Sequence, residues 1–276
     1  MFEKKPVNEE NGFTERQLRE IGYYDKYVNM LNIKNISFDP IEGKRSRPWN
    51  PYWYVYEYVR NYYKKENNKL LDFGCGCGTT SVRFAKIGYE VDAFDISNKS
   101  LDIANTLSIR YGFEKQIHLT RQVAEKLDYP SNYFDIIVGF DILHHVDING
   151  AISECERVLK KGGVAIFKEP VESYVLDNIR NTKFINFIFP SDINYTPGRH
   201  ITQDERKLSR KDIEIFKKYY YVREEKFTLL SRLDILFREL YGKRSSPLEI
   251  IDYLIFKLMP SLKIFGGDAV FVFTKR

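Results

Sequence analysis

A strand, glycine turn, helix and second strand follow one another over residues 69–97 and constrain the fold more than any other stretch. Asp72 leads into the turn Gly74-Cys75-Gly76-Cys77-Gly78, and the second strand-like run ends at Asp95. Glycines let the backbone turn sharply and let a ligand approach the main chain closely. The start of the next helix offers unpaired N–H groups to an electron-rich ligand. This order therefore predicts a ligand-binding turn in an α/β sheet.

The acids and the glycine spacing indicate the kind of ligand. A carboxylate at the end of the second strand, Asp95, can accept hydrogen bonds from two ribose hydroxyls. A dinucleotide fingerprint needs G-x-G-x-x-G, whereas this turn has G-x-G-x-G, which disfavours a nicotinamide oxidoreductase. Asp72, just before the turn, is placed to meet a cation. The alternative is a glycine turn that only joins a strand to a helix.

Strand-like and helix-like segments alternate over residues 70–169. Strands are expected at 117–119, 134–140 and 164–167, and helices at 98–111 and 151–160, the latter ended by two glycines. Such alternation predicts a parallel sheet with helices on both faces. Ligands of these sheets bind at the carboxyl ends of the strands. The residues expected at those ends are Asp72, Asp95, Phe140, His145 and Glu169.

The stretch Leu70 to Gly78 resembles the first motif of class I S-adenosylmethionine-dependent methyltransferases, and the resemblance is specific over about residues 70–170. It implies a Rossmann-like, seven-stranded, mostly parallel sheet with helices on both faces, closed by an antiparallel pair that includes residues 269–273. It also implies S-adenosylmethionine as the cofactor. Asp95 then looks like the acid that binds the ribose, and Asp72 like the acid near the positively charged methionine portion.

Two further segments extend the resemblance. Residues 123–130 are similar to the family segment that lies along the adenine, but Val123 stands where the family often has an acid, so backbone groups are expected to serve there. Residues 141–146 match the loop beside the reacting sulfonium. The cofactor-binding residues expected from the turn and these segments are Asp72, Gly74, Cys75, Gly76, Gly78, Asp95, Ile96, Ala124, Glu125 and Phe140.

The segment before the glycine turn, residues 1–65, is expected to be an N-terminal helical region that acts as a lid. Residues 1–12 read as a frayed tail, and Thr14 with Gln17 forms a capping box that opens a helix. Pro51 suits the first turn of a second, tyrosine-rich helix. Some tyrosine among residues 23–56 is expected over the cofactor; simple packing on the sheet is the alternative.

Residues 66–276 are expected to form the methyltransferase domain, with an insertion at 170–212. The insertion is longer than a connection needs, which is typical of functional loops. It combines an apolar run at 184–189 with a polar cluster, as substrate pockets do. It is therefore predicted to close the acceptor site, with a dimerisation flap as the rival interpretation. Its candidate substrate-binding residues are Tyr195, Arg199 and His200.

Methyl transfer from a sulfonium depends on alignment and needs a base only if the acceptor must lose a proton. Histidine suits that role because its ordinary pKa lies near neutrality. The candidates are His144, His145, Glu169 and His200. His145 is preferred over His144, because only one of two neighbouring side chains readily points inward.

Composition narrows the class of acceptor. The net charge of +5 is mild for 276 residues, and no Pro-Pro-aromatic motif for a flipped base follows the strand at 134–140. A small-molecule acceptor is therefore expected and nucleic acid is not. A nucleic-acid methyltransferase and a non-catalytic, methyltransferase-like binding subunit remain the alternatives.

The cysteines and the apolar segments indicate the cellular compartment of the protein. Its three cysteines, at positions 75, 77 and 155, make neither a disulfide framework nor a four-ligand zinc site. The N-terminus lacks the apolar region of a signal peptide, and no apolar run reaches the length of a membrane span. A cytoplasmic monomer or homodimer without stable membrane insertion is expected. The apolar stripe at 248–258 is expected to serve core or dimer packing.

Overall fold

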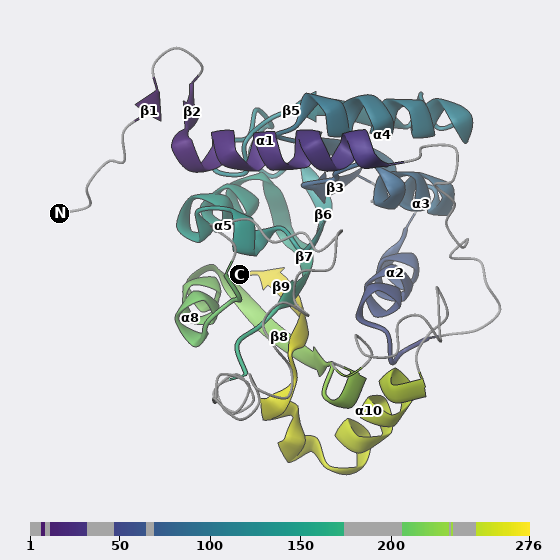
Figure 1. Ribbon diagram of the computed structural model, residues 1–276, viewed down its shortest axis with the longest axis vertical. Coiled ribbons are helices and arrows are strands. Elements are labelled where there is room, and N and C mark those ends of the chain that lie inside the picture. The colour runs from purple at the N-terminus through teal and green to yellow at the C-terminus, as the bar shows by residue number, and fades with distance from the viewer. Residues whose placement is uncertain are drawn as a thin grey trace.

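A seven-stranded sheet in the order β5-β4-β3-β6-β7-β9-β8 forms the centre of the computed structural model (Figure 1). The structure describes residues 7–8, 12–31, 47–64, 69–173, 206–231, 233 and 247–276. Strands β3 to β7 run parallel, and β9 pairs antiparallel with both β7 and β8. The predicted Rossmann-like, mostly parallel sheet is confirmed. The strands are β3 (Lys69–Phe73), β4 (Glu90–Asp95), β5 (Ile117–Arg121), β6 (Phe134–Phe140), β7 (Leu159–Pro170), β8 (Tyr220–Phe227) and β9 (Asp268–Lys275).

Helices flank the sheet on both faces. The capping box predicted at Thr14 and Gln17 is present at the start of α1. The side chain of Asn50 caps α2, which has Pro51 in its first turn. The helices are α1 (Glu15–Met30), α2 (Pro51–Tyr62), α3 (Thr79–Ile87), α4 (Asn98–Arg110), α5 (Ile148–Val158), α8 (Arg210–Tyr219) and α10 (Pro247–Leu258), with short 3-10 turns at Leu143–His145 and Pro260–Phe265.

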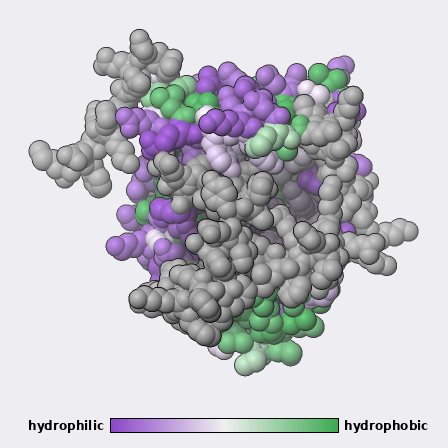
Figure 2. Space-filling view, in the orientation of Figure 1, coloured by the Kyte–Doolittle hydropathy of each residue, from purple (hydrophilic) through white to green (hydrophobic). Residues whose placement is uncertain are grey.

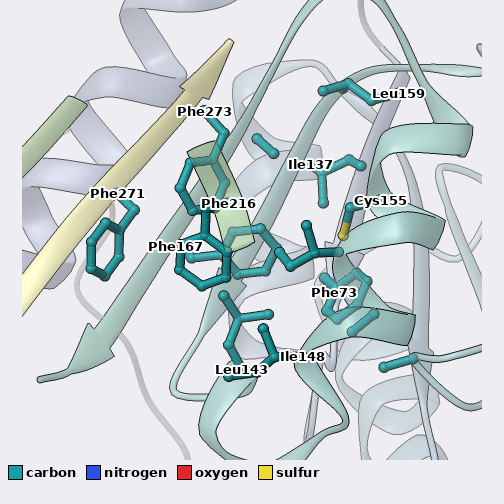
Figure 3. Packing of buried hydrophobic residues seen from close by; sticks show 14 of the residues in the cluster. Phe73, Ile137, Leu143, Ile148, Cys155, Leu159, Phe167, Phe216, Phe271 and Phe273 are labelled. Atoms are coloured by element: carbon teal, nitrogen blue, oxygen red, sulfur yellow. The ribbon is translucent and has the colours of Figure 1, made fainter. Parts of the chain in front are cut away.

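Alternate side chains of the central strands feed two hydrophobic cores. On β3, Leu70 belongs to the core shared with α2, α3 and α4, whereas Leu71 belongs to the core shared with α5 and α8. Figure 3 shows the second core, where Phe167 of β7 lies near Phe273 of β9 and Phe216 of α8. Because both faces are covered, the strands read as continuous apolar runs rather than alternating ones. Because the central strands are packed on both faces of the sheet, the positions of their carboxyl ends, where the candidate site lies, are well determined.

The structure corrects three boundaries. Val7–Asn8 pairs with Phe13–Thr14 as a small antiparallel sheet, so the first twelve residues are not wholly a frayed tail. The helix expected over 151–160 spans Ile148–Val158, and the glycines expected to end it, Gly162 and Gly163, lie within β7. Glycine tolerates the left-handed φ of 75° at position 162, so the chain turns there without leaving the sheet.

The apolar stripe of α10 faces outward. Leu254 is 49% exposed and Leu258 is 80% exposed, so the expectation of ordinary core packing is wrong for these residues. Figure 2 shows the corresponding apolar patch at the lower end of the molecule, where α10 lies. Dimer packing at this stripe stays a prediction. Among the helices that the structure describes, none combines the length and apolarity needed to cross a membrane.

Candidate functional site

The turn between β3 and α3 holds three glycines in left-handed conformations. Gly74, Gly76 and Gly78 have φ angles of 72°, 51° and 73°. A Cβ on Gly78 would lie 2.6 Å from the Cβ of Ala104, and one on Gly74 would lie 2.7 Å from Cγ1 of Ile142. A Cβ on Gly76 would meet nothing within 4 Å. The outer glycines are therefore required for close packing, while the middle one faces open space at the start of α3.

Asp95 lies at the carboxyl end of β4 and is fixed against this turn. Its Oδ2 accepts a hydrogen bond of 2.9 Å from the backbone N of Gly76, and its Oδ1 accepts one of 2.9 Å from the backbone N of Ser97. The backbone of Ile96 also hydrogen-bonds to this carboxylate, which keeps acceptor capacity for a ligand. Ribose hydroxyls are donors of the right kind for it.

Asp72 is buried at the end of β3, next to the turn. Its Oδ2 accepts hydrogen bonds of 2.6 Å from the hydroxyls of both Thr80 and Ser81. Burial raises the pKa of Asp72 to about 6; the two hydroxyls oppose this shift and Asp95 adds to it. Among the described residues, no lysine or arginine forms an ion pair with Asp72 or Asp95. A ligand that brings positive charge and ribose hydroxyls therefore suits the acceptors of these two acids. The space between the glycine turn, Asp72 and Asp95 is called the cleft below.

Two expected cofactor residues in this region have backbone or core roles in the structure. Cys75 is 7% exposed, and its N–H donates to the carbonyl of Phe94 at 2.9 Å, which holds the turn on the end of β4. Burial raises the pKa of the Cys75 thiol well above its usual value. The carbonyl of Ile96 accepts a hydrogen bond of 2.9 Å from Nε of Arg121. Both residues border the cleft, and their contact with a cofactor stays a prediction.

On the expected adenine side, the carboxylate of Glu125 joins three parts of the chain. It accepts hydrogen bonds from Arg16 at 2.5 Å and Gln17 at 3.2 Å, both on α1. It also accepts one of 2.9 Å from the backbone N of Asp147, at the start of α5. Ala124 is buried beside it. The Glu125 side chain is therefore engaged by α1, and the expected backbone contacts with adenine stay a prediction.

Helix α1 also reaches the loop after β4. The hydroxyl of Ser97 donates to Oδ1 of Asp25 at 2.7 Å. Figure 1 shows α1 lying alongside α4 across the upper part of the molecule. The helix thus contacts the loops that carry the expected ribose and adenine contacts. Its role as a lid stays a prediction, now with named contacts.

His145 also lies under α1. Its Nδ1 is 3.3 Å from Oε2 of Glu20, and its Nε2 is 3.3 Å from the hydroxyl of Tyr24. His144 and His145 are 5% and 6% exposed. The expectation that only one of these neighbours points inward is wrong, because the short 3-10 turn buries both.

Glu169 and His144 form a buried pair. Oε2 of Glu169 lies 2.6 Å from Nδ1 of His144, and its Oε1 accepts hydrogen bonds of 2.9 and 2.8 Å from the backbone N of Ile142 and Leu143. Glu169 is 0% exposed. Its lone pairs are used to hold the loop after β6, so the geometry favours an anchoring role over that of a base.

The insertion leaves and returns at one place. Val171 bridges to Leu208 in parallel fashion, and Leu208 N donates to the carbonyl of Pro170 at 3.0 Å, at the carboxyl end of β7. The two ends of the insertion therefore flank the strand ends. Three candidates lie outside the described residues: Tyr195, Arg199 and His200.

A polar group that sequence reasoning missed lies at the ends of β6 and β7. The buried Nζ of Lys168 is 2.8 Å from Oδ1 of both Asp141 and Asp268, and the hydroxyl of Tyr52 donates to Oδ2 of Asp141. The ring of Tyr52 stacks on Phe140 at 5.6 Å. A lysine directly after the apolar run of β7, but still inside the strand, was the one signal in the sequence. Tyr52, Asp141, Lys168 and Asp268 are called the strand-end cluster below.

The fold and the cleft together define a class of protein. A mostly parallel sheet carries a three-glycine turn after its central strand, a buried acid before that turn and a second acid at the end of the next strand. This combination is typical of α/β proteins that bind a nucleoside-containing ligand at the carboxyl ends of their strands.

A sequence match bears on the family. Residues 71–167 match the family model described as a methyltransferase domain. This match supports the predicted resemblance to the class I S-adenosylmethionine-dependent methyltransferases over these residues.

Individual relatives share parts of the chain. The ubiquinone biosynthesis O-methyltransferase of Nitrosococcus oceani is 29% identical over 115 residues, which are 40% of this chain and 47% of the relative. The protein of the same name from Proteus mirabilis is 26% identical over 156 residues, covering 52% of this chain and 63% of the relative. The chain thus spans less than two thirds of either curated relative.

A solved structure extends the likeness of fold beyond the matched domain. Geranyl diphosphate C-methyltransferase from Streptomyces coelicolor, in complex with Mg2+, geranyl diphosphate and S-adenosyl-L-homocysteine, has a TM-score of 0.60 and 13% identity. The superposition covers 95% of this chain and 98% of that one. At this identity the likeness concerns the fold alone.

Replacing Asp72 by asparagine is expected to stabilise the ligand-free protein at neutral pH and to weaken cofactor binding. The folded-state pKa of about 6 lies above the ordinary 3.8, so stability linked to the protonated form is complete below about pH 4 and lost as pH rises through 6. A permanently neutral asparagine avoids that loss, so the free energy of unfolding should rise by on the order of 2 kcal/mol. Urea unfolding at pH 5 and pH 7.5 measures it, and the gain should be larger at pH 7.5.

The matched control for this substitution is Asp92→Asn. Burial also raises the pKa of Asp92, which lies within β4 rather than at its carboxyl end. This control should stabilise the protein without changing the affinity for S-adenosylhomocysteine. Equal affinity of the Asp72→Asn variant and the wild type would contradict the cation-binding role of Asp72.

Proposed function

We propose that the chain binds S-adenosylmethionine and transfers its methyl group to a small-molecule acceptor by direct displacement. The observation that carries the proposal is Asp95, held by the N–H groups of Gly76 and Ser97 beside an open glycine turn and the uncompensated carboxylate of Asp72. Asp95 would bind the ribose hydroxyls, and Asp72 would face the positively charged methionine end. When bound, the ligand supplies a methyl group on a sulfonium, a good leaving group.

The names of similar proteins support the acceptor class. Ubiquinone biosynthesis and geranyl diphosphate methyltransferases act on small molecules by name, and we extend that class to this chain. The strand β6 ends Gly139-Phe140-Asp141-Ile142, without a base-flipping motif. We also propose a cytoplasmic location. All three cysteines are free thiols, and reducing compartments such as the cytoplasm keep cysteines in that state.

Two roles are proposed for the residues of the site: alignment of the reacting atoms and proton transfer. Displacement at carbon gains most from holding the reacting atoms in line, which rigid strand ends favour. Glu169 and His144 would act by fixing the loop after β6. A proton-transfer role stays a prediction for His145, whose ring nitrogens face Glu20 and Tyr24, and for His200.

The proposed function is tested by binding and by label transfer. Titration calorimetry with S-adenosylhomocysteine should give a dissociation constant in the micromolar range or tighter. Methyl-labelled S-adenosylmethionine should then pass label to compounds in a small-molecule panel and not to RNA or DNA. Filter binding of RNA should be weak even at low salt, where counterion release favours it most.

Each outcome tests a different part of the proposed function. Absence of S-adenosylhomocysteine binding by the folded protein would overturn the whole proposal. Label entering RNA or DNA would overturn the small-molecule acceptor and retain the cofactor. Cofactor binding without transfer to any class of acceptor would favour the non-catalytic alternative.

A further inference from the structure

The strand-end cluster adjoins the cofactor cleft through Tyr56. The ring of Tyr56 lies 5.3 Å from that of Phe140, the last residue of β6. Burial raises the pKa of Tyr56 to about 12; Arg83 opposes the shift, while Asp72 and Asp141 both add to it. The Tyr56 hydroxyl is thus within electrostatic reach of one acid from the cleft and one from the cluster. The cluster therefore lies on the side of the cleft where β6 and β7 end.

The buried ammonium of Lys168 holds the acids of the cluster in place. The side chain of Lys168 is only 8% exposed and is 2.8 Å from a carboxylate oxygen of both Asp141 and Asp268. Although burial alone would lower the pKa of Lys168, these carboxylates and Tyr52 raise it well above its usual value. The backbone N of Asp141 also donates to the carbonyl of Lys168 at 2.9 Å. The ammonium thus fixes the positions of the acids and is itself withdrawn from solvent.

The open face of the cluster consists of hydrogen-bond acceptors and an aromatic ring. The side chain of Asp141 is 33% exposed and Tyr52 is 38% exposed. Each oxygen of Asp141 already accepts one hydrogen bond, from Lys168 or from Tyr52, and keeps one lone pair. The Tyr52 hydroxyl gives its proton to Asp141, so its oxygen is left as an acceptor. An incoming group must therefore donate hydrogen bonds.

The charge of the cluster disfavours one class of ligand. The carboxylate of Asp141 is the partly exposed anion of the cluster, and it shares the ammonium of Lys168 with Asp268. A carboxylate or phosphate brought to Asp141 would meet like charge, which disfavours its binding. A neutral hydroxyl or an amine meets no such penalty.

We propose that the strand-end cluster is the acceptor subsite and that it selects an acceptor whose nucleophile is a hydroxyl or amine. Asp141 accepts the hydrogen bond from the O–H or N–H, and the Tyr52 ring, stacked on Phe140, supports an apolar or aromatic body. The inference rests on the proposed function and specifies its acceptor. Asp141 and Tyr52 are acceptor-binding residues, and Lys168 positions them.

The chemical step balances with the groups at hand. The acceptor oxygen or nitrogen forms a bond to the methyl carbon as the carbon–sulfur bond breaks, and the electron pair goes to sulfur. The methylated heteroatom is then far more acidic, so it loses its proton to solvent after the transfer. No oxidant, reductant or further reactant is required.

The test uses conservative variants of the full chain. Tyr52→Phe keeps the ring and loses the hydroxyl, and Asp141→Asn keeps a residue that tolerates the left-handed φ of 51°. The matched control is Tyr54→Phe, on the same helix but against Phe227 of β8. The probes are phenols, catechols, alcohols and primary and secondary amines on one side, and benzoate and geranyl diphosphate on the other.

Two measurements are made on each variant. Label transfer from methyl-labelled S-adenosylmethionine identifies the acceptor class, and saturation-transfer NMR on the S-adenosylhomocysteine complex measures acceptor binding without turnover. Wild-type protein is expected to methylate a hydroxyl or amine probe. Tyr52→Phe and Asp141→Asn should raise the acceptor KM tenfold or more and weaken its NMR signal. Their affinity for S-adenosylhomocysteine should stay within twofold, and Tyr54→Phe should match the wild type.

Three results would overturn the subsite. They are transfer to benzoate or geranyl diphosphate, transfer to hydroxyl or amine probes that the two variants leave unchanged, and no transfer to any hydroxyl or amine by protein that binds S-adenosylhomocysteine. Failure of the wild type to bind S-adenosylhomocysteine would instead overturn the proposed function, so the two failures are distinguishable.

Discussion

Replacing Glu169 by alanine is expected to lower the free energy of unfolding by about 3–5 kcal/mol, because the change removes the acceptor of several buried hydrogen bonds at once. Its carboxylate accepts hydrogen bonds from the backbone of Ile142 and Leu143 and pairs with His144, all in one loop. The substitution would leave these groups buried without their partner. The loop after β6 would then lose its shape, and methyl transfer would be lost with it. Urea unfolding and label transfer measure the two effects.

Glu169→Gln is the informative companion. Its amide oxygen can still accept from the loop backbone, and its NH2 can donate to His144. If Glu169 anchors the loop, this variant should retain much of the stability and part of the turnover. A variant with wild-type stability and cofactor affinity but a thousandfold loss of turnover would instead establish Glu169 as the base, the role considered from the sequence.

Replacing Asp95 by alanine is expected to weaken S-adenosylhomocysteine binding about a hundredfold or more. Each hydrogen bond to a charged group contributes about 1.5–3 kcal/mol, and two ribose hydroxyls are proposed to use this carboxylate. The same change removes the acceptor for Gly76 N, so the glycine turn loses its link to the end of β4. Titration calorimetry gives the affinity, and the thermal shift at saturating ligand gives an independent estimate.

Asp135→Asn serves as the control for Asp95. Asp135 is also buried, but it binds the backbone N of Lys69 and the side chain of Lys160 at the opposite end of the strands. It should change stability and leave the affinity for S-adenosylhomocysteine intact. An Asp95→Ala variant that folds and binds as tightly as the wild type would contradict the assignment of the ribose site.

The glycine turn and its acids were predictable because they are local. Gly74 to Gly78 and the acid at Asp95 are close in sequence, and their spacing alone encodes a turn between parallel strands. The seven-stranded, mostly parallel sheet and the antiparallel final pair followed from the family resemblance. The predicted boundaries were less accurate where residues allow two structures. The glycines at 162 and 163 can end a helix or bend a strand, and they lie in a strand because β7 pairs with β6.

The contacts of the site with distant segments could not be predicted in this way. Tyr52 and Asp141 meet because α2 packs over the end of β6, and nothing in either segment alone specifies that contact. The same holds for Glu125, whose partners on α1 lie far away in sequence. His144 gave no sign of its burial either, since its partner is on the next strand. Only Lys168, a charge directly after an apolar run, had a local signature.

The place of β9 between β7 and β8 has a consequence for how the protein is made. A ribosome completes β7 long before it reaches β9, and until then one side of β7 is an open edge that invites pairing with other chains. Phe271 and Phe273 close the core only when β9 arrives (Figure 3). The last of the seven strands of this sheet to be synthesised thus enters the middle of its antiparallel part rather than its rim. Refolding yield should accordingly fall as protein concentration rises, and nascent chains should depend on chaperones that shield this edge.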